Sequence, residues 1–166
     1  ARRALSSSTY FSWIRQLGIL FSSIGGTSFQ SADLTDADFS GSLLNNTDFR
    51  EAILTRTCFV GVRGLERSLF STSCYLSSIK VRQLAITLNG QEQSFDGMNL
   101  QGINLRYADL QDASFIGTNL NSANLQGANL SRAKLKQTQL EGANLTNVIL
   151  TGACIEDWGI TSTTVL

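Results

Sequence analysis

A large apolar residue, usually leucine or phenylalanine, recurs at every fifth position over most of this chain. The longer run comprises Phe95, Leu100, Leu105, Leu110, Phe115, Leu120, Leu125, Leu130, Leu135, Leu140, Leu145, Leu150 and Ile155. The shorter run comprises Phe29, Leu34, Phe39, Leu44, Phe49, Leu54 and Phe59. This spacing constrains the fold strongly, because few backbone conformations can point every fifth side chain in the same direction.

A period of five residues fits neither a helix nor a straight strand. On an α-helix, successive positions of this kind drift by about 140° and form no stripe. On a strand, an odd spacing places alternate leucines on opposite faces. All these side chains can face one core if the chain turns a corner in every unit. Four sides then close a square coil of about twenty residues, and stacked coils lie about 4.8 Å apart. Residues twenty apart are predicted to lie above one another.

The positions around each central residue support this interpretation. The residue two places earlier is small or apolar, as at Ala123 and Ala128, which suits a second inward position. The residue directly before is often Asn or Asp, as at Asp33 and Asn124. Such side chains bond to nearby backbone and tolerate tight turns. The two positions that follow are polar or glycine and are predicted to face water.

Three units read ADLTD from Ala32, ANLQG from Ala123 and ANLSR from Ala128. They match the A(D/N)LXX consensus, and the chain resembles the pentapeptide repeat family. The resemblance implies an all-β solenoid, a right-handed quadrilateral β-helix, whereas the period alone gives only the square coil. Further similarity to large cyanobacterial members, some with membrane segments upstream, indicates a fragment of a longer protein.

Residues 1–26 are predicted to form an N-terminal tail and a capping α-helix. Apolar residues follow helical spacing over about 9–24, and Gly25 and Gly26 give a stop signal. Such a helix can cover the end of a solenoid core, which otherwise exposes pairing edges. The alternative is a membrane-proximal or partner-binding helix. Residues 27–166 form the predicted β-helix.

The repeats are expected at about 27–61 and 93–157, with an interruption at about 62–92. Within the interruption, the segment from Ser78 to Ala85 is predicted to form a short helix, and Asn89–Gly90 a turn. The interruption is either an insertion that a solenoid tolerates or a loop that a partner recognises. The candidate partner contacts are its basic residues, Arg63, Arg67, Lys80 and Arg82.

The composition excludes several kinds of chemistry. The 13 basic and 13 acidic residues balance, so the chain has no strong field to attract nucleic acid or an anionic membrane. It has no histidine, which removes His-based triads and His metal sites. No cofactor or metal is expected. Membrane association is expected only through a missing upstream segment.

The three cysteines, Cys58, Cys74 and Cys154, are too widely spaced to indicate a metal site. We expect free thiols in a reducing compartment, with a Cys58–Cys74 bridge as the alternative. A cytoplasmic location follows, and the alternative is the soluble part of a membrane-anchored protein.

The leading functional hypothesis is a non-catalytic scaffold for an unidentified protein partner. The family resemblance adds an alternative, a DNA mimic that binds a DNA-binding enzyme such as gyrase. That role needs a strongly acidic surface. The longer run of repeats, at about 93–157, is nearly neutral, which disfavours the role. An enzyme is the third possibility, but the nearby acids Asp109 and Asp112 have no evident cleft, so the chain is predicted not to be one.

Overall fold

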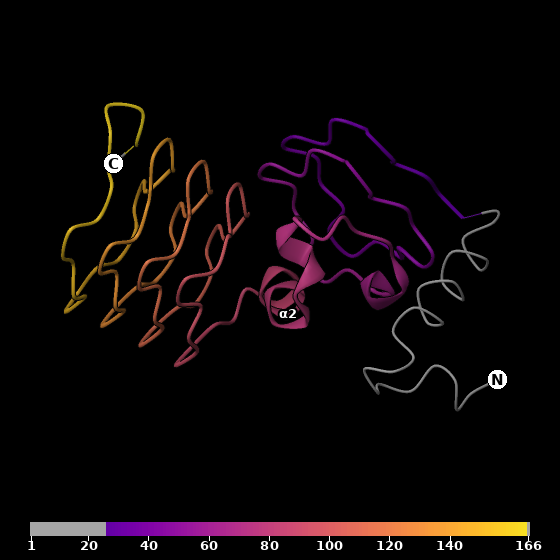
Figure 1. Cartoon of the computed structure of the whole chain (residues 1–166). Helices are drawn as coiled ribbons and strands as arrows, with labels where there is room; N and C mark the ends of the chain where they lie inside the picture. The colour runs from indigo at the N-terminus through magenta and orange to yellow at the C-terminus, as the bar shows by residue number, and fades with distance from the viewer. Residues whose placement is uncertain (1–25, 166) are drawn as a thin grey trace, which may run out of the picture.

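The computed structural model describes residues 26–165, which form two stacks of square coils with the helix α2 between them (Figure 1). We call residues 27–77 the first block and residues 89–165 the second block. Within the described residues the helices are η2 (Leu65–Arg67), η3 (Tyr75–Ser77) and α2 (Ile79–Thr87). The capping helix predicted within residues 1–26 lies outside the described residues.

The sheet contacts are single parallel β-bridges between successive coils. They join residues twenty apart, as in Ser28–Asp48 and Asn124–Asn144, except at Asp48–Leu69 and Asn144–Val165. The predicted twenty-residue coil is therefore confirmed. Aromatic rings stack in the same register: the ring centroids are 5.5 Å apart in Phe29–Phe49, 5.8 Å in Phe39–Phe59 and 5.2 Å in Phe95–Phe115.

One unit of the second block shows how the sequence makes each side and corner. Ala123 and Leu125 point inward and are fully buried. Asn124 Oδ1 accepts a hydrogen bond from the Gln126 amide (3.1 Å), and the Ala128 amide donates to Leu125 O (2.9 Å), which closes the turn. Each coil thus hydrogen-bonds its own corners, and this satisfies backbone groups that a buried turn would otherwise strand.

The first block contains an irregular corner at η2. Leu65 is one residue late for the repeat, yet it is fully buried. Gly64 precedes it with φ 84°, and a Cβ at this position would lie 2.0 Å from Asn45 Oδ1. Glycine is therefore required both by the left-handed backbone and by the close approach of Asn45. The extra residue shifts the next bridge to Asp48–Leu69, and Phe70 stacks on Phe49 at 5.6 Å.

The helix α2 joins the cores of both blocks. Val81 and Leu84 belong to the core of the second block, whereas Ala85 packs in the core of the first. The helix lies where the segment from Ser78 was predicted to be helical, and it continues to Thr87. In Figure 1 it occupies the space between the two stacks.

The second block begins earlier than the sequence indicates. The bridge Asn89–Asp109 places Asn89 and Gly90 in the first side of the coil, so the turn predicted there is wrong. The start predicted at about residue 93 is likewise late. Gly90 holds the central position that leucine fills elsewhere, and a Cβ on it would meet Leu110 Cδ2 at 2.9 Å and Leu84 Cδ1 at 3.0 Å. Leu84 of α2 thus occupies the space of the missing side chain.

Candidate functional site

The backbones of the two blocks are hydrogen-bonded to each other at a corner on the edge of a cleft. The Arg56 amide donates to Gly102 O (2.5 Å), and Asn104 Nδ2 donates to Arg56 O (2.9 Å). Thr55 approaches Gly102 so closely that a Cβ there would lie 3.2 Å from Thr55 Cα. This corner and α2 fix the second block against the first at two separate places.

The cleft beside this corner has a volume of about 320 Å³. It is bounded by the second coil of the first block, the segment before α2 and the first coil of the second block. Its lining residues are Phe49, Glu51, Ala52, Ile53, Leu54, Thr55, Ser71, Ser73, Cys74, Tyr75, Asn99 and Gln101. Three separate parts of the chain therefore converge at the junction, which makes the cleft the strongest candidate site in the described range.

The buried side chains of the cleft are not chemically activated. The Tyr75 hydroxyl donates to Leu54 O (3.0 Å), and burial raises the pKa of Tyr75 far above its ordinary value. Burial also raises the pKa of the Cys74 thiol. A thiol with a raised pKa carries little thiolate at neutral pH, so Cys74 is a poor nucleophile. The cleft is suited to binding rather than to catalysis.

The four predicted contact residues do not line this cleft. Lys80 Nζ donates to Ser94 O and lies 4.7 Å from the centre of the Phe95 ring. Arg82 donates to Leu65 O (3.5 Å), and its guanidinium lies 5.9 Å from the centre of the Phe70 ring, so both basic residues contact the protein itself.

The other two predicted contacts are exposed. Arg63 lies in the bridge with Leu43 at the end of the second coil. Arg67, at the end of η2, has its Nε 4.0 Å from Glu66 Oε1, a weak pairing between exposed groups. The cleft residues Glu51, Asn99 and Gln101 were missed by sequence reasoning, because each occupies an ordinary outward position of the repeat. The packing of the two blocks against α2 and against each other brings them together.

The acids considered for catalysis do not converge. Asp109 accepts hydrogen bonds from Gln91 Nε2 (2.8 Å) and Gln111 Nε2 (3.1 Å). Asp112 instead pairs with Arg132 one coil above, at 2.5 Å. Among the described residues, no group of three or more His, Cys, Asp or Glu is arranged to hold a metal ion. Cys58, Cys74 and Cys154 are free thiols, so the alternative Cys58–Cys74 bridge is not formed.

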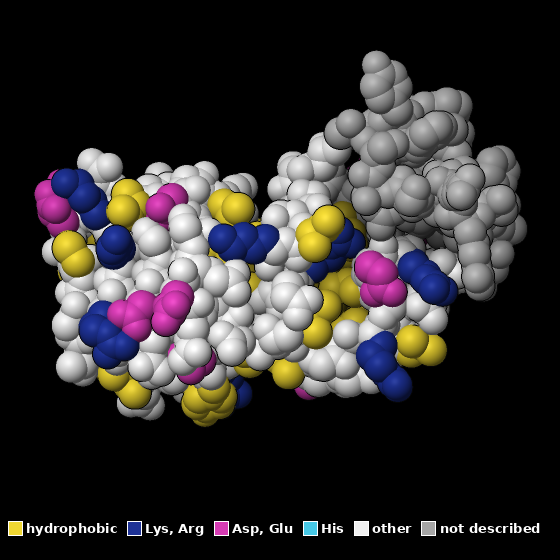
Figure 2. All heavy atoms as spheres, turned by 90° about the horizontal axis from the view of Figure 1, so that it is seen from below, with side chains coloured by type: hydrophobic (Ala, Val, Ile, Leu, Met, Phe, Trp, Pro, Cys, Tyr) yellow, Lys and Arg dark blue, Asp and Glu magenta, His cyan; other side chains and the backbone are white. Residues whose placement is uncertain are grey.

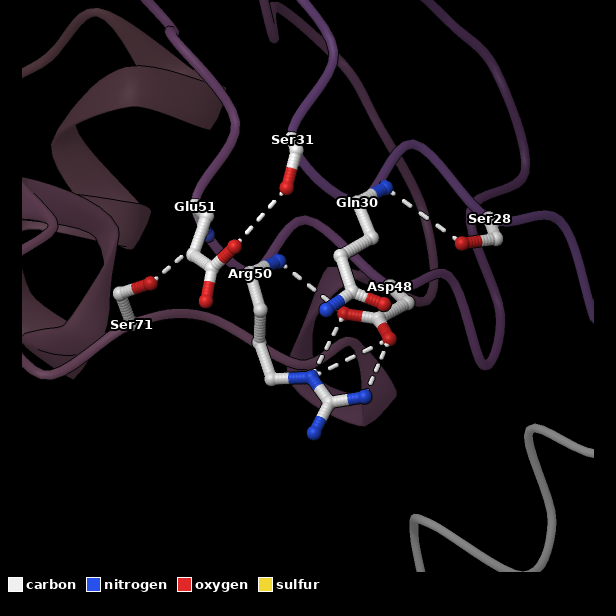
Figure 3. A network of polar contacts seen from close by, with 7 residues as sticks. All are labelled: Ser28, Gln30, Ser31, Asp48, Arg50, Glu51 and Ser71. Carbon is white, nitrogen blue, oxygen red and sulfur yellow. Dashed lines mark hydrogen bonds and ion pairs between the residues drawn. The ribbon is translucent and has the colours of Figure 1, made fainter.

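Polar side chains, including Glu51 and Ser71 of the cleft lining, form ladders along the stack (Figure 3). Ser31 Oγ donates to Glu51 Oε2 (2.8 Å), and the Glu51 amide donates to Ser71 Oγ (2.8 Å), so one ladder crosses three coils. Beside it, Arg50 holds Asp48 through Nε and Nη2, with the closest contact at 2.6 Å. These hydrogen bonds from Arg50 lower the pKa of Asp48.

Acid is expected to remove the stabilisation by this pair. The pKa of Asp48 is lower in the folded state than its ordinary value of 3.8. The pair therefore stabilises the protein at pH values above 3.8, and this stabilisation is lost as the pH falls through the lowered pKa of the folded state. Asp48→Asn should therefore lower the thermal midpoint at neutral pH and reduce its further fall in acid. The pair is expected to contribute no more than about 1 kcal/mol, since Arg50 is partly exposed. The thermal midpoint measured across the acid range tests this prediction, with Glu141→Gln, at an exposed position, as the control. An equal fall of the midpoint in acid for Asp48→Asn and wild type would contradict it.

No helix within residues 26–165 combines the length and the apolar composition needed to cross a membrane.

Comparison with known proteins identifies the class. The family model for pentapeptide repeats matches residues 27–63 and, in overlapping segments, 91–125, 99–137 and 123–157, with 8 copies. These matches cover more than half of the chain, which therefore belongs to the pentapeptide repeat family. Proteins of this family fold as right-handed quadrilateral β-helices. No curated protein sequence matches the chain significantly.

Several solved structures are similar to this chain. HetL, a pentapeptide repeat protein involved in heterocyst differentiation regulation from Nostoc sp. strain PCC 7120, is 26% identical over 80% of this chain, with a TM-score of 0.26. The match spans 63% of HetL, which is less than two thirds of its length. Rfr23 from Cyanothece 51142 is 17% identical over 90% of this chain and 98% of its own, with a TM-score of 0.31. A pentapeptide repeat protein of the Arabidopsis thaliana thylakoid lumen is 28% identical over 45% of this chain and 59% of its own, with a TM-score of 0.21.

Proposed function

We propose that this protein is a non-catalytic scaffold for protein–protein interaction. The observation that supports this most is the regular bridging of the second block, where successive coils pair at every side from Asn89 to Gly159. Such a stack holds its outward side chains at fixed spacing, so a partner meets a surface that is already ordered. Proteins of this family are commonly interaction modules, and family members are generally non-catalytic.

A DNA-mimicking role has weaker support. In Figure 2, Lys and Arg side chains are interspersed with Asp and Glu over the visible face. Charged side chains also pair between coils, as Arg56 does with Asp36 and Lys136 with Glu156. Internally paired charges give no continuous acidic surface to imitate a DNA backbone. The mixed charge therefore favours a protein partner that does not bind DNA.

The capping helix expected at about 9–24 stays a prediction, and the end of the first block has side chains that such a cap could cover. The core side chains Phe29, Leu34 and Phe39 of the first coil are only partly buried, unlike Phe49 and Phe59 in the next coil. An end cap would complete their burial.

We further propose a reducing location such as the cytoplasm, which the three free thiols support.

Capture of partners from the source cell tests the scaffold. Deleting the whole interruption, residues 62–92, would remove all four candidate contacts, but it would also remove the buried residues Leu65, Leu76 and Leu84 and so disturb the fold. The double variant Arg63→Ala, Arg67→Ala instead changes exposed groups only. Immobilised wild-type protein should retain at least one protein saturably, and the double variant should retain less of it, by roughly two- to fivefold. Retention of no saturable partner by the wild type would overturn the scaffold, and equal retention by both would remove these arginines from its contact surface.

A further inference from the structure

The cleft at the junction contains an unpaired backbone edge on the first block. In a regular coil, each central amide donates to the coil above, as Leu125 does to Asn144 O (2.9 Å). Phe49 follows this pattern and donates to Leu69 O (2.9 Å). One side later, the Leu54 amide has no acceptor among residues 26–165. The next amide of this edge, that of Arg56, donates to Gly102 O of the second block (2.5 Å), so the unpaired donor lies beside the corner where the blocks meet. An unpaired amide at a strand edge is a point where another strand can pair.

The segment that would pair with Leu54 in a regular coil forms η3 instead. Continuing the register of Asp48–Leu69 would bring Cys74 above Ile53. Instead, the Cys74 amide donates to Ser71 O (3.0 Å), and Cys74 O accepts from Ser77 (2.9 Å). The third coil therefore turns away after Leu69 and Phe70, and the side from Ile53 to Thr55 has no paired strand above it. Its contact with η3 is the hydrogen bond from the Tyr75 hydroxyl to Leu54 O (3.0 Å).

A second unpaired edge belongs to the first coil of the second block. In the next coil, the Asn119 amide donates downward to Met98 O (3.0 Å). The equivalent amide of Asn99 has no acceptor in the described part of the chain. Asn99 and Gln101 line the same cleft as Ile53, Leu54 and Thr55. The cleft thus lies between two strand edges, one from each block.

The size and charge of the cleft restrict what can enter it. Its 320 Å³ is the volume of roughly ten water molecules, which suits a few residues of extended chain and not a folded element. Glu51 is the one charged residue in its lining. The neighbouring arginines are held elsewhere, Arg50 by Asp48 and Arg56 by Asp36. A cationic side chain on the incoming segment would complement Glu51.

We propose that this junction cleft binds an extended peptide segment of a partner protein that carries a lysine or arginine. The segment adds a strand between the two blocks, with main-chain hydrogen bonds to the edges at Leu54 and Asn99 and its cationic side chain near Glu51. Strand addition of this kind takes affinity from the main chain and specificity from alternate side chains. The inference rests on the scaffold function and names the class of its partner.

A synthetic peptide tests the proposal directly. The probe is fluorescein-labelled Ala-Asn-Leu-Lys-Gly-Ala, a consensus coil segment with a lysine, titrated with the whole protein by fluorescence anisotropy. We expect saturable binding, weakened roughly two- to fivefold by Glu51→Gln and unchanged by the matched variant Glu141→Gln. A peptide with an N-methylated leucine should bind at least about fivefold more weakly, because it lacks one main-chain donor.

The native thiols locate the bound peptide. Cys74 lines the cleft, whereas Cys154 is exposed in the second block and does not line the cleft. Alkylation is carried out at alkaline pH, where the Cys74 thiol ionises despite its raised pKa. Bound peptide should slow alkylation of Cys74 and leave that of Cys154 unchanged. No saturable binding, binding without protection of Cys74, or equal binding of the N-methylated peptide would each overturn the proposal. Protection of Cys74 that rises with protein concentration alone would assign the cleft to a second copy and overturn it as well. A partner retained from the cell despite such results would leave the scaffold function standing.

Discussion

Replacing Leu125 by asparagine is expected to cause a large loss of stability. Leu125 is fully buried in the middle of the second block, with Leu105 and Leu145 of the adjacent coils also buried. Leu125→Asn removes apolar burial worth on the order of 2–5 kcal/mol. It also leaves an amide among leucines, which costs about 1–3 kcal/mol more if it finds no hydrogen-bond partner. Thermal denaturation followed by circular dichroism measures the loss.

The adjacent position provides the matched control. Gln126 follows Leu125 directly, and its side chain points outward from the coil and is partly exposed. Gln126→Ala should change the free energy of unfolding by less than about 0.5 kcal/mol. The hydrogen bond to Asn124 Oδ1 comes from the backbone amide of residue 126, which the substitution keeps. A greater loss in Gln126→Ala than in Leu125→Asn would show that the inward and outward positions are assigned wrongly.

Replacing Gly90 by leucine is expected to destabilise the protein, although it restores the repeat. Leucine is the residue that the five-residue pattern places at this position. Its Cβ, however, would meet Leu84 Cδ1 at 3.0 Å and Phe95 Cε2 at 3.2 Å, and the rest of the side chain would enter the space that Leu84 fills. Overpacking of this kind costs about 1–3 kcal/mol. Chemical denaturation monitored by fluorescence measures the change.

Two further variants separate steric overlap from the loss of glycine. At Gly159, an added Cβ would approach no atom closer than 3.7 Å, so Gly159→Ala should be nearly neutral, whereas Gly90→Ala should already destabilise. Leu84→Ala opens space for the new side chain, and its combination with Gly90→Leu should be less destabilised than the sum of the two single variants. Strict additivity, or a more stable Gly90→Leu, would refute the account of α2 as the element that fills this position.

The sequence alone determines the coil. The interval between Phe95 and Ile155 is regular, and a chain that turns a corner in every five-residue unit points all the central residues inward. The bridge from Asn124 to Asn144 and the burial of Leu125 both follow from that interval. These features are local and repeated, so every unit gives the same information and an error in one unit is corrected by its neighbours.

The tertiary structure alone decides how the two blocks meet. Asn89–Gly90 reads as a turn in the sequence, although Gly90 holds a central position of the repeat. The side chain that fills the space of the missing leucine comes from Leu84 in a separate helix, and the repeat does not reveal this. Lys80 and Arg82 look free for a partner, yet each contacts an aromatic ring of this protein. The cleft joins Glu51, Cys74 and Asn99 from three segments. The five-residue period describes contacts within a block, whereas these contacts depend on where α2 packs, and nothing in the repeat encodes that position.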